Sequence, residues 1–219
     1  LCSLTYCTVS HKEEFKLDHY KAEFGSDDGI KLLIELLEKY QQQEPILQHI
    51  TRLLTNLLYV ESNMKLFGKE NGCKVLIQVL EMNQRNVALV DEMCLCIINA
   101  SFLPENIPTF HKQSNVCAVL ISILQIHSTQ EENAYLVEHV CQALTNLTTY
   151  ASHQAVAVES NACAQLISVL NTYAPLKHLS VVEQCCRAIT NIANRPDGQE
   201  QFGLCQSCEI MMQLLKQQL

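Results

Sequence analysis

Ala143-Leu144-Thr145-Asn146-Leu147 is the first half of a motif whose second half begins sixteen residues after the Asn, as Ala162-Cys163-Ala164-Gln165-Leu166-Ile167-Ser168-Val169-Leu170. Other copies of the second half begin at Gly29, Gly72, Val116 and Ser207, so that successive copies start 43, 44, 46 and 45 residues apart. In every copy the residues four, seven and eight positions after the first are apolar. That spacing is typical of a helical stripe that packs into a core.

The first half of the motif recurs in step with the second. Its other copies occupy residues 53–57, 96–100 and 188–192, and the offsets between their Asn residues are 43, 47 and 45. Each Asn precedes the next copy of the second half by 16 or 17 residues. Two patterns that hold the same phase over four repeats predict an all-α chain of stacked helical units.

This combination, A-L-x-N-L followed after about sixteen residues by G-x-L-x-x-L-L, resembles the armadillo repeat of catenins and importin-α. The resemblance covers essentially the whole chain and implies a right-handed α–α superhelix with three helices in each repeat. It places G-x-L-x-x-L-L on the second helix and A-L-x-N-L on the third, which lines a concave groove. We expect one domain over residues 1–219, with repeats at 29–71, 72–115, 116–161 and 162–206 and partial repeats at 1–28 and 207–219.

The two ends depart from the regular pattern. Leu1-Cys2-Ser3-Leu4-Thr5 occupies the A-L-x-N-L position, and about ten extra residues follow at 11–20. The last second-helix copy reaches Leu219 with no third helix after it. Because a solenoid needs polar repeats at its termini, we expect the natural protein to continue in at least one direction. The extra residues at 11–20 fit either a binding loop or a spacer.

Eight of the twelve cysteines occupy repeat positions that suit small apolar core residues: Cys73, Cys94, Cys96, Cys117, Cys141, Cys163, Cys186 and Cys208. A free cysteine behaves as a small hydrophobe, so we expect these eight to be buried. Equivalent positions in successive repeats lie about 10 Å apart, which is too far for a disulfide. Cys205 and Cys208 form a C-x-x-C pair without the further ligands that a zinc site needs. The pattern favours reduced thiols and a cytoplasmic protein, with nuclear or cytoskeletal association left open.

Several classes of function conflict with the composition. The net charge of −8 and the lack of basic clusters argue against nucleic acid as a partner. The longest apolar run, residues 116–124, is shorter than the roughly 20 residues that span a bilayer. There is no phosphate-binding glycine loop, no G-x-S-x-G and no H-E-x-x-H. We therefore predict that the chain is not an enzyme and uses no cofactor and no metal.

The resemblance implies a role for the four repeat Asn residues, Asn56, Asn99, Asn146 and Asn191. In the armadillo family such an Asn holds the main chain of an extended peptide, because an amide both donates and accepts hydrogen bonds. The alternative is that each Asn ties helices together inside the stack. Residues four positions earlier share the same helix face: Arg52, Leu95, Gln142 and Arg187. With Leu103, Leu95 would make one segment of the groove apolar.

A further column lies eight positions before each Asn and contains Gln48, Asp91, Glu138 and Glu183. Its three carboxylates form either an acidic row for basic partner side chains or ordinary first-turn acids, which favour a helix dipole. The chain has no Trp, which the similar nuclear-import adaptors carry four positions before the Asn. This difference argues against a receptor for localisation signals.

We therefore expect a scaffold or adaptor that binds an extended or helical segment of a partner protein in the groove. One alternative is a regulator of a small GTPase, which would grip a folded partner over a broad surface. Another is an architectural module of a cytoskeletal or ciliary complex. The identity of the partner and the oligomeric state stay open.

Overall fold

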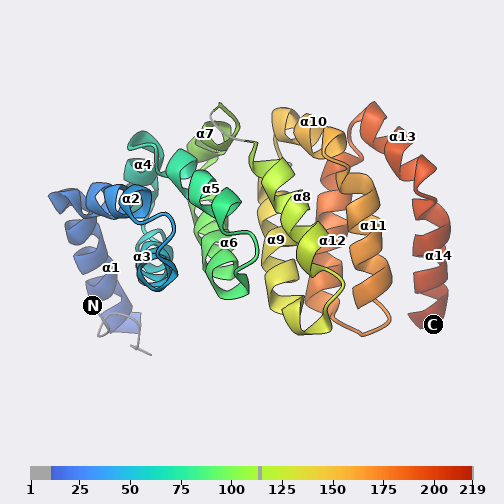
Figure 1. Cartoon of the computed structure of the whole chain (residues 1–219), viewed down its shortest axis with the longest axis horizontal. Helices are drawn as coiled ribbons and strands as arrows, with labels where there is room; N and C mark the ends of the chain where they lie inside the picture. The colour runs from blue at the N-terminus through green and yellow to red at the C-terminus, as the bar shows by residue number, and fades with distance from the viewer. Residues whose placement is uncertain (1–10, 113–114, 219) are drawn as a thin grey trace. The chain divides into compact units, whose positions relative to one another are not determined.

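The computed structural model describes the backbone of residues 11–112 and 115–218 and most of their side chains. Every regular element in these ranges is helical, so the all-α prediction is confirmed (Figure 1). The chain divides into two compact units, Leu1–Ser114 and Asn115–Leu219. The division falls next to the expected repeat boundary between residues 115 and 116. The expected third-helix position of Leu1-Cys2-Ser3-Leu4-Thr5 lies outside the described residues.

Unit 1 contains seven α-helices and two short helical turns among its described residues. In chain order these are α1 (His11–Phe24), the π-turn η2 (Gly25–Gly29), α2 (Ile30–Lys39), α3 (Glu44–Leu57), α4 (Glu61–Lys69), α5 (Gly72–Met82), α6 (Val87–Ser101), the 3₁₀ turn η3 (Pro104–Asn106) and α7 (Ile107–Lys112). The extra residues at 11–20 thus belong to a helix. Within this unit α3 lies beside α6, and α2 lies beside α5 (Figure 1).

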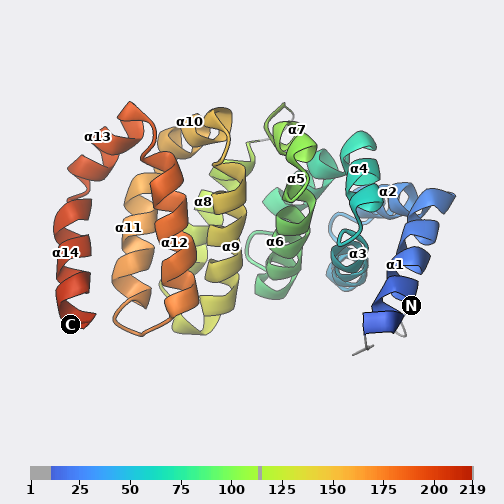
Figure 2. The same cartoon turned by 180° about the vertical axis from the view of Figure 1, so that it is seen from behind.

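In unit 2, as in α4, α5 and α6 of unit 1, a short first helix is followed by a longer second helix and a still longer third helix. Its elements are α8 (Val116–His127), the 3₁₀ turn η4 (Glu131–Asn133), α9 (Ala134–Leu147), α10 (Ala151–Glu159), α11 (Ala162–Tyr173), α12 (Leu179–Ile192), α13 (Pro196–Leu204) and α14 (Ser207–Gln218). Here α9 packs against α12, and α11 contacts both α8 and α14 (Figure 2). The first half of the sequence motif ends the long third helices, and the second half forms the second helices.

A left-handed backbone turn precedes four of the five described second helices, and α8 is the exception because Asn115 has φ −87°. Residues Asp28, Asn71, Asn161 and Gln206 have φ between 53° and 66°, the left-handed region. Asp and Asn tolerate that region better than most residues, since their short side chains bond locally. Gly72 follows Asn71 because a Cβ there would lie 2.4 Å from the Phe67 ring.

The core lies along the apolar stripes of the second and third helices. The expected stripe residues Leu33, Leu37, Leu76, Leu80, Leu120, Leu124, Leu166 and Leu170 are all buried. Burial of one such leucine contributes about 1.5–3 kcal/mol before entropy is considered. The helical period in the sequence was therefore sufficient to identify these core positions.

Side-chain amides at the first helix of each repeat, the short helix before the second helix, make a polar contact that recurs along the chain. In unit 1 Asn63 Nδ2 donates to the carbonyls of Leu57 and Lys21, both at 3.0 Å. Asn106 Nδ2 donates likewise to Ala100 at 3.0 Å and to Met64 at 2.9 Å. Each amide therefore joins the end of the preceding third helix to the previous first-helix segment. In unit 2 Gln154 and Gln199 make the first of these contacts, to Thr148 and Ala193, both at 2.8 Å.

The cysteine prediction holds for six of its eight members. Cys73, Cys94, Cys96, Cys117, Cys141 and Cys163 are buried, and all ten described cysteines are free thiols. Burial raises the pKa of Cys73, Cys96 and Cys117 to about 12. The prediction is wrong for Cys186 and Cys208, which are exposed. Their equivalents Cys141 and Cys163 lie in helices that a following repeat covers, whereas no described helix covers α12 and α14 on that side.

Candidate protein-binding surface

The residues predicted to bind a partner lie on the third helices, α3 and α6 in unit 1 and α9 and α12 in unit 2. The two helices of each pair pack side by side. We call the outward-facing residues of each pair its third-helix surface.

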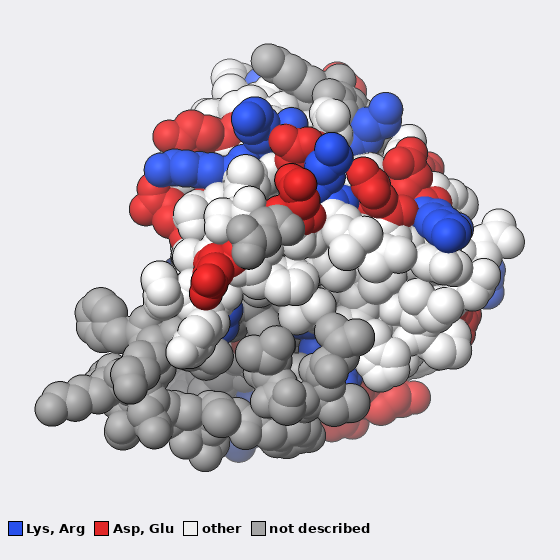
Figure 3. Space-filling view, turned by 90° about the vertical axis from the view of Figure 1, so that its left-hand side faces the viewer, with Lys and Arg blue, Asp and Glu red and all other residues white. Residues whose placement is uncertain are grey.

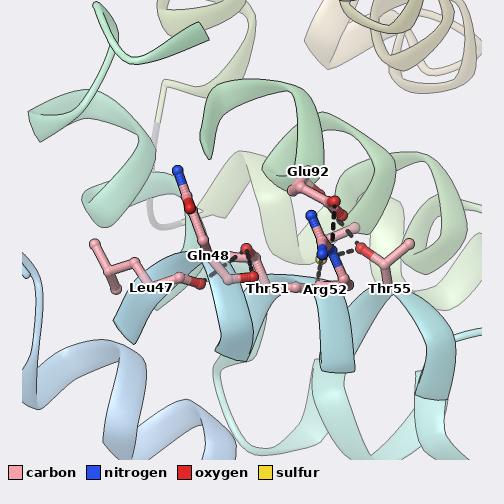
Figure 4. A network of polar contacts seen from close by, with 7 residues as sticks. Leu47, Gln48, Thr51, Arg52, Thr55 and Glu92 are labelled. Atoms are coloured by element: carbon pink, nitrogen blue, oxygen red, sulfur yellow. Dashed lines mark hydrogen bonds and ion pairs between the residues drawn. The ribbon is translucent and has the colours of Figure 1, made fainter. Parts of the chain in front are cut away.

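Polar contacts tie α3 to α6 at the surface of unit 1 (Figure 4). Arg52 Nε donates to Glu92 Oε1 at 3.0 Å, and Thr55 Oγ1 donates to the Glu92 carbonyl at 3.3 Å. Below them the Cys96 thiol donates to the Thr51 carbonyl at 3.3 Å. The Arg52 side chain is exposed, and such ion pairs contribute only about 0–1 kcal/mol. The contact therefore orients Arg52 more than it stabilises the fold.

The amide groups of two repeat Asn residues bridge neighbouring third helices. Asn99 Nδ2 donates to the Thr55 carbonyl at 3.0 Å, and Asn99 is only 4% exposed. Asn191 Nδ2 donates to the Thr145 carbonyl at 2.9 Å and approaches Thr148 Oγ1 at 3.4 Å. Asn56, Asn146 and Asn191 are half-buried. For Asn99 and Asn191 these contacts correspond to the alternative that the repeat Asn ties helices together inside the stack. Asn99 also has almost no exposed surface that a peptide could contact.

The remaining predicted residues of unit 1 are accessible to different extents. Gln48, Asp91 and Leu95 are half-buried, and Arg52 is exposed. The expectation for Leu103 is wrong, because its side chain is 8% exposed and belongs to the core.

Two aromatic residues of unit 1 were missed by the sequence prediction. Tyr59 and Phe102 are each 64% exposed and follow Asn56 and Asn99 by three positions. Phe102 directly follows the end of α6, and Tyr59 lies two residues beyond the end of α3. The Lys21 ammonium group lies 5.6 Å from the centre of the Tyr59 ring. Their common offset from the Asn was a signal in the sequence that could have identified them.

In unit 2 the predicted polar residues already bond to one another. Ser180 Oγ donates to Glu138 Oε2 at 2.7 Å, which joins α12 to α9. Arg187 pairs with Glu183 at 2.7 Å one turn away on α12. Gln142 is half-buried. Of the three carboxylates expected in one acidic column, Asp91 belongs to unit 1, and Glu138 and Glu183 belong to unit 2. Both of the latter have a polar partner within their own unit.

Two other regions of the described chain have mixed charge. Viewed from the α1 end, acidic and basic side chains are intermixed (Figure 3). Lys31, Glu35 and Lys74 line a hollow of about 310 Å³ between α2 and α5, also of mixed charge. Among the described residues, no group of three or more His, Cys, Asp or Glu side chains is arranged to hold a metal ion. In the same part of the chain no single helix has the length and apolar character to cross a membrane; α6 and the segment from Pro104 to Phe110 pass that test only as a pair bent by 115°.

Comparison with known proteins gives no further assignment. No family model matches the chain, and no curated protein or solved structure matches it either.

Proposed function

We propose that the chain is an armadillo-type right-handed solenoid that binds a segment of a partner protein on its third-helix surface. The observation that carries the proposal is the pair Tyr59 and Phe102, large aromatic side chains at equivalent positions of consecutive repeats and each 64% exposed. Neither ring is buried in the core of unit 1, and aromatic residues dominate the energetics of protein interfaces. Their recurrence at one register favours a shared partner over chance exposure.

The spacing of the third helices limits what the pair can bind. Packed helices lie about 8–10 Å apart, so the two rings present contacts roughly that far from each other. An extended segment advances about 3.3 Å per residue, and a helix about 1.5 Å. The partner therefore needs two apolar side chains about three residues apart if it is extended, or about seven apart if it is helical.

Polar neighbours add direction to this surface. Arg52 is exposed on α3 and held at 3.0 Å from Glu92, so its guanidinium group is positioned in advance to meet an acidic or carbonyl group. Gln48 lies one turn before Arg52 and offers an amide that pairs with a backbone irrespective of side-chain sequence. A segment with apolar anchors and an acidic or neutral polar residue between them fits this arrangement. We further propose a cytoplasmic setting, which the reduced, buried thiols favour.

A display library of natural protein segments tests the proposal. The chain serves as bait, and the double variant Tyr59→Ser/Phe102→Ser serves in counterselection to remove segments that bind elsewhere. We expect enriched segments that share two apolar residues at one of the two calculated spacings. Enrichment of segments that bind both baits equally would place the binding surface elsewhere and overturn the proposal.

A further inference from the structure

A hollow of about 310 Å³ lies between the second helices α2 and α5 of unit 1, which pack side by side (Figure 1). Its floor is apolar, because Ile34 and Val75 line it and are each only 5% exposed. Polar and charged side chains surround this floor: Lys31, Glu35, Glu38, Glu70, Asn71, Lys74 and Gln78. The hollow thus combines a small apolar base with a charged rim.

The charged groups of the rim form no ion pair with one another or with any other residue that the structure describes. Lys31 and Glu35 are four residues apart on α2, a spacing at which ion pairs form readily, yet they remain apart. Glu70 and Lys74 are half-buried, so each has lost part of its hydration without gaining a counter-charge. A ligand with charges of both signs would supply these missing partners.

Positive and negative groups are segregated along the hollow. Lys31 and Lys74 lie in the first turns of α2 and α5, at equivalent positions 43 residues apart. Glu35 and Glu38 lie one and two turns further along α2, roughly 6 Å and 10 Å beyond the level of Lys31. Glu70 precedes α5, so the two lysines and Glu70 sum to a charge of +1, against −2 from Glu35 and Glu38. The hollow therefore has a cationic end and an anionic end.

The repeat fold does not require these charges. In unit 2 the helices α8 and α11 are the equivalent neighbours, and they also pack against each other. The positions that hold two lysines, a glutamate and a glutamine in unit 1 hold Ala118, Ala164, Ser122 and Ser168 in unit 2. Second helices therefore pack without charged residues at these positions, and the charged rim is a particular property of unit 1.

We propose that the hollow binds an extended segment of a partner protein through an acidic residue and a basic residue two positions apart. The acidic side chain would pair with Lys31 and Lys74, and the basic side chain with Glu35 and Glu38. In an extended chain, side chains two positions apart point to the same side and lie about 6.6 Å apart. This distance matches the roughly 6 Å between the levels of Lys31 and Glu35. The apolar floor would contact the aliphatic stems of both side chains.

The volume of the hollow selects an extended segment. A helix with its side chains is 10–12 Å across, so two turns of it fill roughly 800 Å³, far more than the 310 Å³ present. An extended chain at the spacings of a β-sheet fills only about 160 Å³ per residue. The hollow therefore has room for about two residues of an extended chain. Small-molecule pockets start near about 300 Å³ but are lined mainly by apolar side chains, unlike this one.

NMR titration of the isotope-labelled intact chain with the peptide acetyl-Gly-Glu-Ala-Arg-Gly-amide tests the proposal. We expect saturable shifts of backbone amides in residues 31–38 and 70–78. The peptide acetyl-Gly-Glu-Arg-Ala-Gly-amide has the same composition, but its two charged side chains point to opposite sides of an extended chain. It should therefore bind at least about tenfold more weakly.

Two double variants with the same change in net charge locate the site. Lys31→Glu/Lys74→Glu makes the rim anionic throughout and should weaken binding of the first peptide at least about tenfold. The same variant should bind acetyl-Gly-Arg-Ala-Arg-Gly-amide more tightly than the unmodified chain does. It should fold, because glutamate in the first turn suits the helix dipole. Lys39→Glu/Lys69→Glu changes exposed lysines outside the hollow and should leave the affinity within about twofold.

This hollow is separate from the aromatic pair of the proposed function, so Tyr59→Ser/Phe102→Ser should leave binding of the first peptide unchanged. Four results would overturn the proposal. The first is the lack of saturable shifts in residues 31–38 and 70–78 at millimolar peptide, and the second is equal affinity for the two peptides of matched composition. The third is an equal loss of affinity in the two lysine variants. The fourth is saturable shifts centred on Tyr59 and Phe102, which would assign the peptide to the third-helix surface.

Discussion

Replacement of Asn106 by Ala should lower the free energy of unfolding of unit 1 by about 2 kcal/mol. The Asn106 side chain is buried and its Nδ2 donates two hydrogen bonds, to Ala100 at 3.0 Å and to Met64 at 2.9 Å. Each such bond contributes about 0.5–1.5 kcal/mol net, so two account for roughly 1–3 kcal/mol. The carbonyl of Ala100, near the end of α6, also accepts a long 3.4 Å bond from the Leu103 amide. The cost of the substitution is therefore shared between the Ala100 and Met64 carbonyls, which both lose the Asn106 donor.

Urea unfolding followed by circular dichroism measures this effect. With a slope of about 2 kcal/mol per molar urea, a loss of 2 kcal/mol lowers the midpoint by roughly 1 M. Asn106→Asp should cost more than Asn106→Ala, because it keeps the shape but places a carboxylate against two carbonyl oxygens. The neighbouring Glu105 is exposed, so Glu105→Ala should change stability by no more than about 0.5 kcal/mol. If Asn106→Ala matches Glu105→Ala, the amide contacts do not hold the repeats together.

Three further predictions follow from the same contacts. Asn99→Ala should destabilise unit 1 by about 1–2 kcal/mol, because it removes the 3.0 Å bond to the Thr55 carbonyl. The affinity of the folded variant for a partner should stay within twofold of the unmodified chain. A large loss of affinity at unchanged stability would contradict the structural role assigned to Asn99. Gly68→Ala should destabilise unit 1 because the added Cβ would meet the Asn106 amide oxygen. In an Asn106→Gly background the same change should cost little, and an equal cost in both backgrounds would rule out that collision. Burial raises the pKa of Cys117 to about 12. The unfolded thiol loses its proton near pH 9 while the folded thiol keeps it, so stability is full below pH 9 and falls toward pH 12. In urea titrations at pH 8 and 10, Cys117→Ala should reduce the fall of the unfolding free energy with pH by up to roughly 1.4 kcal/mol per pH unit. If the unfolding free energy changes equally with pH in both proteins, the burial argument is contradicted.

The sequence predicted helix positions well because two independent periods had to agree. The apolar stripe fixed which side of each second helix is buried, and four second helices begin at the residues from which the repeats were counted: Gly72, Val116, Ala162 and Ser207. A left-handed residue precedes three of them, and Asn115 before Val116 is the exception. Local patterns are reliable here because each repeat contacts mainly its neighbours.

The sequence predicted the burial of individual side chains less well, because burial depends on which residues of the neighbouring helix lie opposite each side chain. Asn99 and Asn56 hold the same repeat position, but Asn99 is buried and Asn56 is half-buried. Cys186 repeats the position of Cys141 and differs only in having no described helix over it. The first-helix amides escaped notice because their partners are backbone carbonyls of other segments, which leave no mark in the sequence. Only the offset of 43 residues between Asn63 and Asn106 could have indicated them.

Calorimetric affinity for a selected partner segment is the most direct test of the third-helix surface as a binding site. Three proteins are compared: the unmodified chain, the double variant Tyr59→Ala/Phe102→Ala, and Leu32→Ala, which removes a 52% exposed apolar side chain from α2 in the same unit. Circular dichroism and urea midpoints should show all three folded. Aromatic contacts at an interface centre each contribute about 2 kcal/mol, so the double variant should bind at least 30-fold more weakly while Leu32→Ala binds as the unmodified chain does. Equal affinity of the double variant, or an equal loss in Leu32→Ala, would contradict the proposed surface.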